Sequence, residues 1–190
     1  MRIDVRVDTR AVEAALKALG REGKAAAGRA LDRTIVGMRQ LATDMTLAEL
    51  NLKEGAVKKR MSIRRAHGTL EAAVRIAAKP SPLLDFKGTS FSKKSRRGVA
   101  FKPKRGGSRI RLKHAFILNL KSGPRVFERA RVGGRFVGRL PVVALTSTFV
   151  AQFISGARQL GALRQYGVRR FTNEFRHELN FRLRRRMGAL

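Results

Sequence analysis

The sequence lacks several residue types, and each absence excludes a kind of chemistry. The 190 residues include no cysteine, so disulfide bonds and thiolate metal sites are excluded. Tryptophan is absent and Tyr166 is the only tyrosine, which leaves little material for an aromatic platform that stacks single-stranded bases. No apolar run approaches the ~20 residues that span a bilayer, and the first residues do not resemble a signal peptide. We therefore expect no membrane association.

Acidic residues are scarce, whereas basic residues are abundant. There are 13 Asp and Glu against 43 Lys and Arg, which gives a formal net charge of +30. Self-repulsion at this charge opposes a compact isolated chain, so we expect a polyanionic or acidic partner. Glu174 and Glu178 stand four residues apart in an arginine-rich helical stretch, where balancing the local charge is the favoured interpretation.

No motif for catalysis or metal binding is present. His67, His114 and His177 are far apart in the sequence and have no metal-ligand spacing, so surface or packing roles are expected for them. The few carboxylates do not pair in the manner of acid–base catalysis, and there is no phosphate-binding loop or nucleophile elbow. The sequence predicts a protein that is not an enzyme and needs no cofactor and no metal.

More than half of the excess charge lies in the middle of the chain. Residues 87–139 contain 17 basic residues and one acidic residue, Glu128, for a net charge of +16. Lysine and arginine that meet phosphates release counterions, which gives strong, salt-sensitive and sequence-independent attraction to DNA. No helix-turn-helix, zinc finger or RNA-recognition motif is present. The candidate contacts with DNA or an acidic partner are Lys58, Lys59, Arg60, Lys93, Lys94, Arg96, Arg97, Lys102, Lys104, Arg105, Arg109 and Arg111.

Helical periodicity occurs on either side of this basic segment. Asp8 or Thr9 is a candidate N-cap for a first helix, which Gly20 and Gly23 are expected to interrupt. A longer helix is expected over 24–49. The stripe of that longer helix is Ala27, Leu31, Ile35, Met38, Leu41, Ala42 and Met45. A short basic helix is expected over 53–61. The last helix has the stripe Val168, Phe171, Phe175, Leu179 and Leu183, after a helical start at Val150, Phe153 and Ile154.

The remaining segments indicate strands. Ile3, Val5 and Val7 alternate with polar residues, as in a half-buried strand. Further strands are expected over 69–78, closed by Pro80 and Pro82, and over 83–86. Residues 98–102 and 109–120 flank a turn-rich loop and predict a hairpin with a mobile basic tip, and Val126-Phe127 and Phe136-Val137 predict a second hairpin around Gly133-Gly134. The order predicts one α+β domain over 1–190, with an N-terminal strand, two to three helices, antiparallel strands with basic loops and a long C-terminal helix.

Four stretches together resemble a known family. They are AAAGRALDRTIVGMRQLA (25–42), NLKEGAVKKRMSIRRA (51–66), RIRLKHAFILNLKSGPRVFERA (109–130) and LPVVALTSTFVAQF (140–153), the last leading to a helix that ends in RLRRR (182–186). In layout and composition the chain resembles the minor tail protein Z, or tail-completion, family of lambda-like long-tailed bacteriophages. The resemblance covers nearly the whole chain but includes no diagnostic motif, and it transfers no catalytic residue.

The resemblance implies a structural role in the virion. Such a protein would complete the head-proximal end of the tail or the head–tail junction and assist the positioning and passage of the genome. It would form a homo-oligomer, which is expected to be a ring. The ring would contact the tail terminator, tail tube and neck proteins, and double-stranded DNA in the channel would be a further partner. It would assemble in the host cytoplasm and reside in the virion.

Two other functions remain open at this point. A sequence-independent nucleic-acid-binding protein, associated with the nucleoid or the ribosome, would also use a concentrated basic segment. A phosphate-processing enzyme such as a nuclease is disfavoured, because metal-dependent turnover needs carboxylates that this chain has in short supply.

Overall fold

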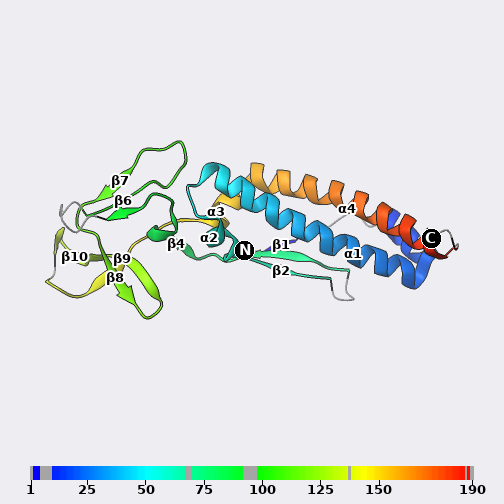
Figure 1. The fold of residues 1–190 in the computed structure, drawn as a ribbon, viewed down its shortest axis with the longest axis horizontal. Helices are drawn as coiled ribbons and strands as arrows, with labels where there is room; N and C mark the ends of the chain where they lie inside the picture. The colour runs from blue at the N-terminus through cyan, green and yellow to red at the C-terminus, as the bar shows by residue number, and fades with distance from the viewer. Residues whose placement is uncertain are drawn as a thin grey trace. The chain divides into compact units, whose positions relative to one another are not determined.

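The computed structural model describes residues 2–4, 10–66, 70–91, 98–136, 138–186 and 188, and the chain divides into two compact units. Unit 1 comprises residues 1–43, 61–77 and 154–190, and unit 2 comprises residues 44–60 and 78–153. The fold is α+β, as the sequence predicted, with long helices near both ends of the chain and small antiparallel sheets between them (Figure 1).

Unit 1 consists of two long helices and one small sheet. Helix α1 continues for its last residues into unit 2. The sheet has the strand order β1-β3-β2, and both pairings are antiparallel. The elements are β1 (Arg2–Asp4), α1 (Arg10–Glu49), β2 (Met61–Arg64), β3 (Ala73–Ile76) and α4 (Ala157–Arg186).

The two long helices lie side by side because small side chains on α1 meet large ones on α4 (Figure 1). Ala26, Ala27 and Ala30 are fully buried against Phe171 and Phe175, whose rings stack with centroids 5.7 Å apart. Alanine has high helix propensity and little bulk, so α1 stays helical and still admits two phenyl rings. The predicted core stripes are confirmed at Ala27, Phe171 and Phe175, whereas Ala26 and Ala30 lie outside the predicted stripe.

The stripes differ from the prediction at their margins. Ile35, Met38 and Ala42 are buried on α1, whereas Leu31, Leu41 and Met45 are half-buried. On α4, Val168 is 42% exposed and does not join the core, because the buried face of the helix at that level is formed by Gly167 and Phe171.

A distortion at Gly20 divides α1, where the sequence predicted two helices. Gly20 has φ 50° and ψ −119°, a conformation that glycine adopts without strain, and the helix resumes beyond it. Gly23, the second predicted interruption, lies inside the helix and is buried. The helix then packs on the sheet, where the Thr43 hydroxyl donates to the Met61 sulfur over 3.7 Å.

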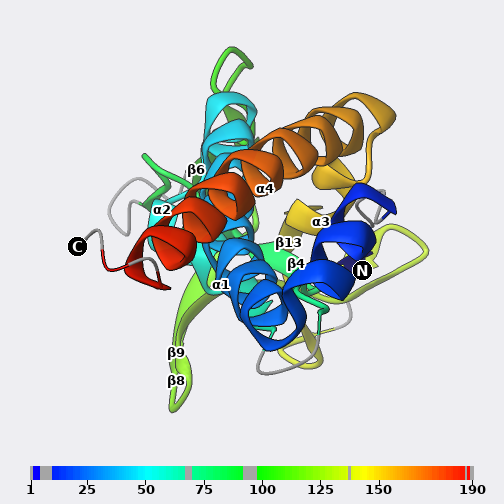
Figure 2. The ribbon, with the colours of Figure 1, turned by 90° about the vertical axis from the view of Figure 1, so that its right-hand side faces the viewer.

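Unit 2 consists of short strands and short helices. Its sheets have the strand orders β12-β9-β8, β5-β6-β7, β13-β4 and β10-β11, all antiparallel. Strands β8 and β9 form the longest hairpin, a narrow two-stranded arm in Figure 2. The elements are α2 (Glu54–Lys58), β4 (Pro80–Pro82), the 3-10 helix η1 (Leu83–Asp85), β5 (Ser90–Phe91), β6 (Val99–Phe101), β7 (Ile110–Leu112), β8 (Phe116–Leu120), β9 (Gly123–Arg129), β10 (Arg131–Val132), β11 (Arg135–Phe136), β12 (Val142–Ala144), β13 (Thr146–Phe149) and α3 (Val150–Ile154).

Two predictions for the residues that enter unit 2 were wrong, and a third, that Pro80 and Pro82 close a strand, was incomplete. The short helix ends at Lys58 rather than at Met61, because the Arg60 side chain donates to the carbonyl of Ala56 and Met61 begins a buried strand. Residues 80–82 do not merely close a strand but pair with β13, which two prolines tolerate because β4 is an edge strand. Residues 83–86 are not a strand, since the Phe86 amide donates back to the carbonyl of Leu83 in a 3-10 turn.

The turns of both predicted hairpins are confirmed, but the strands that flank them differ from the prediction. Strand β6 pairs with β7 around the basic loop, yet the expected strand over 109–120 breaks where the Ala115 amide donates to the carbonyl of Leu112. Gly133 and Gly134 form the second turn with positive φ at both positions, between β10 and β11. Val126 and Phe127 belong instead to β9, and Val137 lies outside the described residues, as do Val5 and Val7 of the predicted N-terminal strand.

Candidate functional site

The candidate site is the basic part of unit 2, where cations far outnumber carboxylates. Residues 44–60 and 78–153 contain 22 Lys and Arg and only five Asp and Glu. Even if every carboxylate of this unit held one cation, 17 cations would have no acidic partner within it. A surface of this kind has a strong positive potential and attracts polyanions over several ångströms, with a strength that falls as salt rises.

The basic hairpin, which we define as residues 98–112, holds the centre of this charge. Its strand β6 is fully buried, and the Phe101 ring packs edge-on against Phe86 with centroids 5.6 Å apart. Strand β7 pairs with β6 at the edge of the sheet and is largely exposed, so one strand of the hairpin lies in the core and the other lies at the solvent.

The loop of the basic hairpin is tied to the segment that follows α1. The backbone N–H of Asn51 donates to the Pro103 carbonyl over 2.9 Å, and the backbone N–H of Arg105 donates to the Glu49 carbonyl over 2.9 Å. Leu50 and Lys104 form an antiparallel bridge between these two bonds. The sequence predicted a mobile tip, but this backbone pairing fixes the entry to the loop, a long-range contact that local pattern could not show.

The predicted contact residues of the hairpin are mostly exposed. Lys104, Arg105, Arg109 and Arg111 are exposed, whereas Lys102 is half-buried. The guanidinium of Arg109 donates to the Gly88 carbonyl, which holds its side chain against the neighbouring turn. Lys93, Lys94, Arg96 and Arg97, also predicted contacts, lie outside the described residues.

The second predicted cluster, at α2, divides into different roles. Lys58 forms an ion pair with Glu54 one turn earlier, and its hydrogen bond and charge lower the pKa of that carboxyl. Lys59 is exposed. Arg60 is 14% exposed in its side chain and binds the Asp85 carboxylate at 3.2 Å and the carbonyls of Ala56 and Pro80 at 3.0 and 3.1 Å. Arg60 therefore joins three segments of unit 2.

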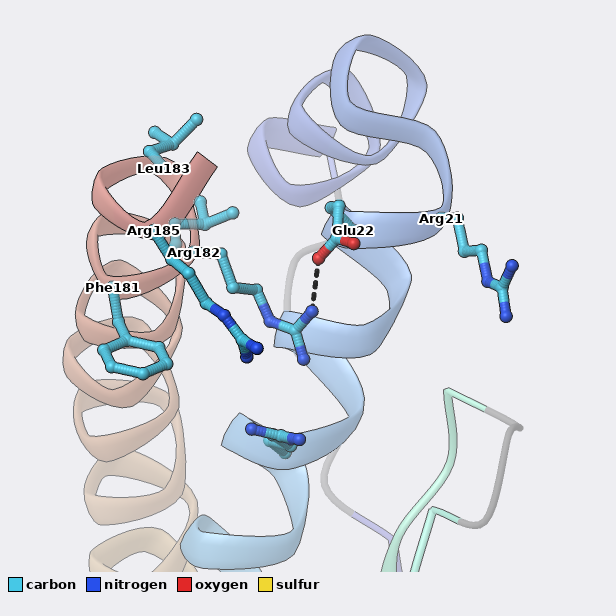
Figure 3. A pocket seen from close by; sticks show the side chains of 8 residues that line it. Arg21, Glu22, Phe181, Arg182, Leu183 and Arg185 are labelled. Atoms are coloured by element: carbon cyan, nitrogen blue, oxygen red, sulfur yellow. Dashed lines mark hydrogen bonds and ion pairs between the residues drawn. The ribbon is translucent and has the colours of Figure 1, made fainter. Parts of the chain in front are cut away.

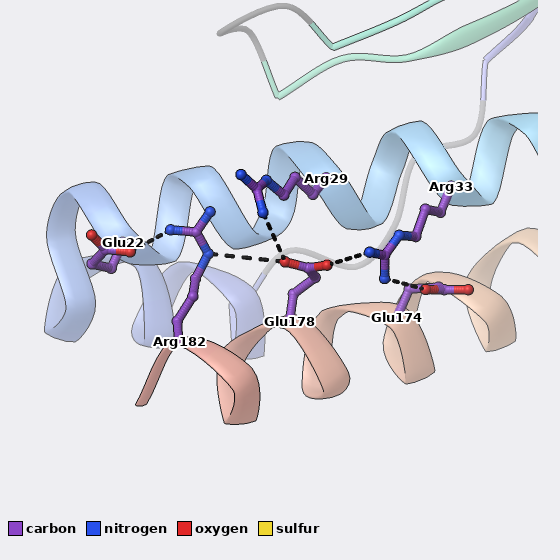
Figure 4. Close-up of polar contacts among 6 residues, drawn as sticks. All are labelled: Glu22, Arg29, Arg33, Glu174, Glu178 and Arg182. Atoms are coloured by element: carbon purple, nitrogen blue, oxygen red, sulfur yellow. Dashed lines mark hydrogen bonds and ion pairs between the residues drawn. The ribbon is translucent and has the colours of Figure 1, made fainter. Parts of the chain in front are cut away.

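A group of ion pairs between α1 and α4, which the sequence did not predict as such, lies in unit 1 (Figure 4). Glu178 is 2% exposed, and its carboxylate lies 2.8 Å from Arg33 and 3.9 Å from Arg29. Glu174 lies 3.3 Å from the same Arg33. The sequence indicated charge balancing for these glutamates within their own helix. Their shortest contacts are to α1, a finding that required knowing which helix faces them.

The described residues show no arrangement that suits metal binding or membrane insertion. Among them, His, Asp and Glu do not gather in groups of three or more that could hold a metal ion, and no helix is long and apolar enough to cross a membrane. His114 and His177 are exposed, and His67 lies outside the described residues.

Comparison with known proteins identifies the family. No curated protein and no solved structure matches the chain. A family model described as prophage minor tail protein Z (GPZ) matches residues 9–188, which include both long helices and the whole of unit 2. The match implies a structural component of a bacteriophage tail, within the virion and in contact with other tail proteins. The resemblance noted in the sequence is confirmed, and the chain belongs to the prophage minor tail protein Z family.

Proposed function

We propose that this protein completes the head-proximal end of the tail, at the head–tail junction, as a homo-oligomer. The basic hairpin contacts the DNA that is positioned there or passes through the junction. The observation that carries the proposal is the imbalance of 22 cations against five carboxylates in unit 2, together with four exposed cations on a hairpin whose loop is fixed. In a tail component, a concentrated positive surface without a base-reading motif suits a partner whose sequence varies, such as a genome.

The position on the tail is tested by labelling. Purified tails that carry a tagged copy of the chain should bind gold-labelled antibody at the end that joins the head, and native mass measurement should show a homo-oligomer. Label at the distal tip or along the tail shaft would overturn the proposed position. A protein that binds DNA but is absent from virions would instead favour a nucleic-acid-binding protein of the host or prophage.

The role of the hairpin is tested by a matched pair of variants. Lys104, Arg105, Arg109 and Arg111 are changed together to glutamine in one variant. The control variant also has four substitutions to glutamine, at exposed arginines of α4. These are Arg158, Arg164, Arg169 and Arg176. Both variants lose the same net charge, so a general effect of charge cancels between them.

The hairpin variant should lose affinity for duplex DNA and reduce the slope of log affinity against log salt by about one for each lost phosphate contact. Tails that carry it should yield fewer infectious particles than the control. Equal DNA affinity and equal infectivity of the two variants would contradict a DNA-contacting role. Normal DNA affinity of the hairpin variant with loss of its incorporation into tails would show that the hairpin binds an acidic tail protein instead.

A further inference from the structure

A pocket of about 740 Å³ lies in unit 1, between α1 and the C-terminal end of α4. Its lining combines arginines with large apolar side chains. Figure 3 shows Arg182 and Arg185 extending from α4 toward α1, and Glu22 of α1 facing Arg182, whereas Arg21 extends away from α4. All of the described residues that line the pocket belong to α1 or α4.

The charge of this pocket is positive even after its internal ion pairs are counted. Four arginines and one carboxylate, Glu22, line it. Glu22 is bound by Arg182, and the buried Glu178 lies 3.9 Å from Arg29 at the α1–α4 interface. When Glu178 is counted together with Glu22, four arginines and two carboxylates leave a net charge of +2. Arg185 is exposed and has no ion pair to a described residue, so its guanidinium is available to an incoming anion.

The apolar part of the lining is unusually exposed for its residue types. Phe181 is 43% exposed and Leu183 is 40% exposed, and Leu179 is half-buried beside them. These residues lie on the same helix as Arg182 and Arg185, so α4 contributes both apolar and cationic groups to the lining. A ligand that fills the pocket must offer anionic groups to the arginines and an apolar group to Phe181 or Leu183.

We propose that this pocket binds an acidic peptide segment of a partner protein, in which carboxylates flank an aliphatic or aromatic side chain. Arg185 and Arg29 bind the carboxylates, and the apolar side chain of the peptide packs against Phe181. Charge complementarity excludes a second copy of the same surface as the occupant, because two such pockets repel each other. The proposal does not depend on the position of the protein on the tail.

A peptide fits this pocket better than duplex DNA does. A duplex backbone offers phosphates at regular spacing but no apolar side chain that would pack against Phe181 and Leu183 and remove their exposed surface from water. The volume of about 740 Å³ is that of a single ligand pocket, large enough for several residues of a peptide.

The test uses the full-length protein and a fluorescein-labelled peptide of repeated Glu-Glu-Leu. We expect saturable binding, and binding that is weaker by about tenfold when Leu is replaced by Ser in the peptide. The variant R185E should lose about tenfold or more in affinity for the peptide, because one charge-assisted contact is replaced by a repulsion. The matched control is R184E, which changes the charge by the same amount at an exposed neighbouring position outside the lining.

Three results would overturn the proposal. These are no binding of the Glu-Glu-Leu peptide at low salt, equal loss with R184E and R185E, and equal affinity for the Leu and Ser peptides. Tighter binding of a duplex probe that R185E weakens and R184E does not would assign the pocket to DNA and also overturn it. A photo-crosslinker beside the peptide Leu keeps the test independent of variants, since in wild-type protein it should label residues 179–185. Labelling elsewhere would contradict the site.

Discussion

Arg33 of α1 binds Glu178 of α4, with 2.8 Å between a guanidinium nitrogen and the carboxylate, while the glutamate side chain is only 3% exposed. Helix α4 contains nine arginines and two glutamates, and both glutamates lie against Arg33. In a chain with so few carboxylates, two of them are thus placed between helices that would otherwise bring cations together. The pairing also fixes which face of α4 meets α1, because only one face has carboxylates.

Replacing Glu178 with glutamine should destabilise unit 1. The substitution leaves Arg33 and Arg29 beside a buried neutral amide, but both arginines are about half exposed or more and can regain water. We therefore expect a loss of about 1–3 kcal/mol in the free energy of unfolding, below the usual cost of breaking a fully buried pair. Urea unfolding followed by helical circular dichroism measures it. Glu174, whose side chain is more exposed, is the control, and an equal loss for Glu174→Gln would contradict the role of burial.

Two glycines of α1 should respond to alanine in opposite ways. An added Cβ at Gly28 meets nothing within 4 Å, so Gly28→Ala should raise the free energy of unfolding by about 0.5–1 kcal/mol through helix propensity. At Gly37 the same atom would lie 2.5 Å from the Arg170 guanidinium and 2.6 Å from the Tyr166 hydroxyl. Gly37→Ala should therefore gain less stability than Gly28→Ala or lose stability. Thermal unfolding of the two variants measures the difference, and equal stabilisation would show that the Tyr166–Arg170 pair moves without cost.

Gly98 should be the least replaceable glycine of the basic hairpin. It has φ +70°, and a Cβ there would lie 2.0 Å from the Leu112 carbonyl oxygen, which is backbone and cannot move aside. Gly98→Ala should therefore weaken the β6–β7 pairing, by about 1–3 kcal/mol for the overlap in addition to the strain of positive φ. Gly88→Ala, with φ +67° and only the Arg109 side chain at 3.9 Å, measures the strain alone. Amide hydrogen exchange over 98–112 should rise in Gly98→Ala and much less in Gly88→Ala.

Arg60 and Lys59 should separate stability from binding at the second basic cluster. Arg60→Ala removes an ion pair with Asp85 and two bonds to carbonyls, so we expect unit 2 to lose about 1–3 kcal/mol. Lys59 is exposed, and Lys59→Ala should change stability by less than about 0.5 kcal/mol. If Lys59 contacts DNA, its variant lowers duplex affinity without a change in stability. Urea unfolding and salt-dependent DNA binding, measured on both variants, distinguish the two roles.

The long helices were predictable because their periodicity is local. Alanines and large apolar residues recur at helical spacing over many turns, and the structure buries Ala27, Ile35, Phe171 and Phe175 as that spacing requires. The short elements of unit 2 were harder. Residues 83–86 and 109–120 contain enough apolar residues for a strand. In each segment, however, one backbone hydrogen bond, to the carbonyl of Leu83 or of Leu112, closes a turn that interrupts the extended chain. Such bonds depend on neighbours that a sequence window does not include.

For the candidate site too, the sequence indicated what depends on composition and could not indicate what depends on distant neighbours. The excess of cations in residues 87–139 is a property of the composition, and it predicted the sign of the partner without any coordinates. The sequence could not separate Arg60, which binds Asp85 within the unit, from Arg111, which is exposed, because both stand in similar basic runs. It also gave no sign of the pocket at the end of α4, since the pocket needs Arg182 and Glu22, which are 160 residues apart.

By itself the sequence determined the α+β class, the two long helices, the family and the net positive charge. These follow from local periodicity, from the layout of the chain and from net charge, none of which needs a long-range contact. Only the tertiary structure decided which cations are internal and which are exposed, and which face of α4 meets α1. The physical reason is that a charge is neutralised or presented according to the groups beside it in space, and those groups come from distant parts of the chain.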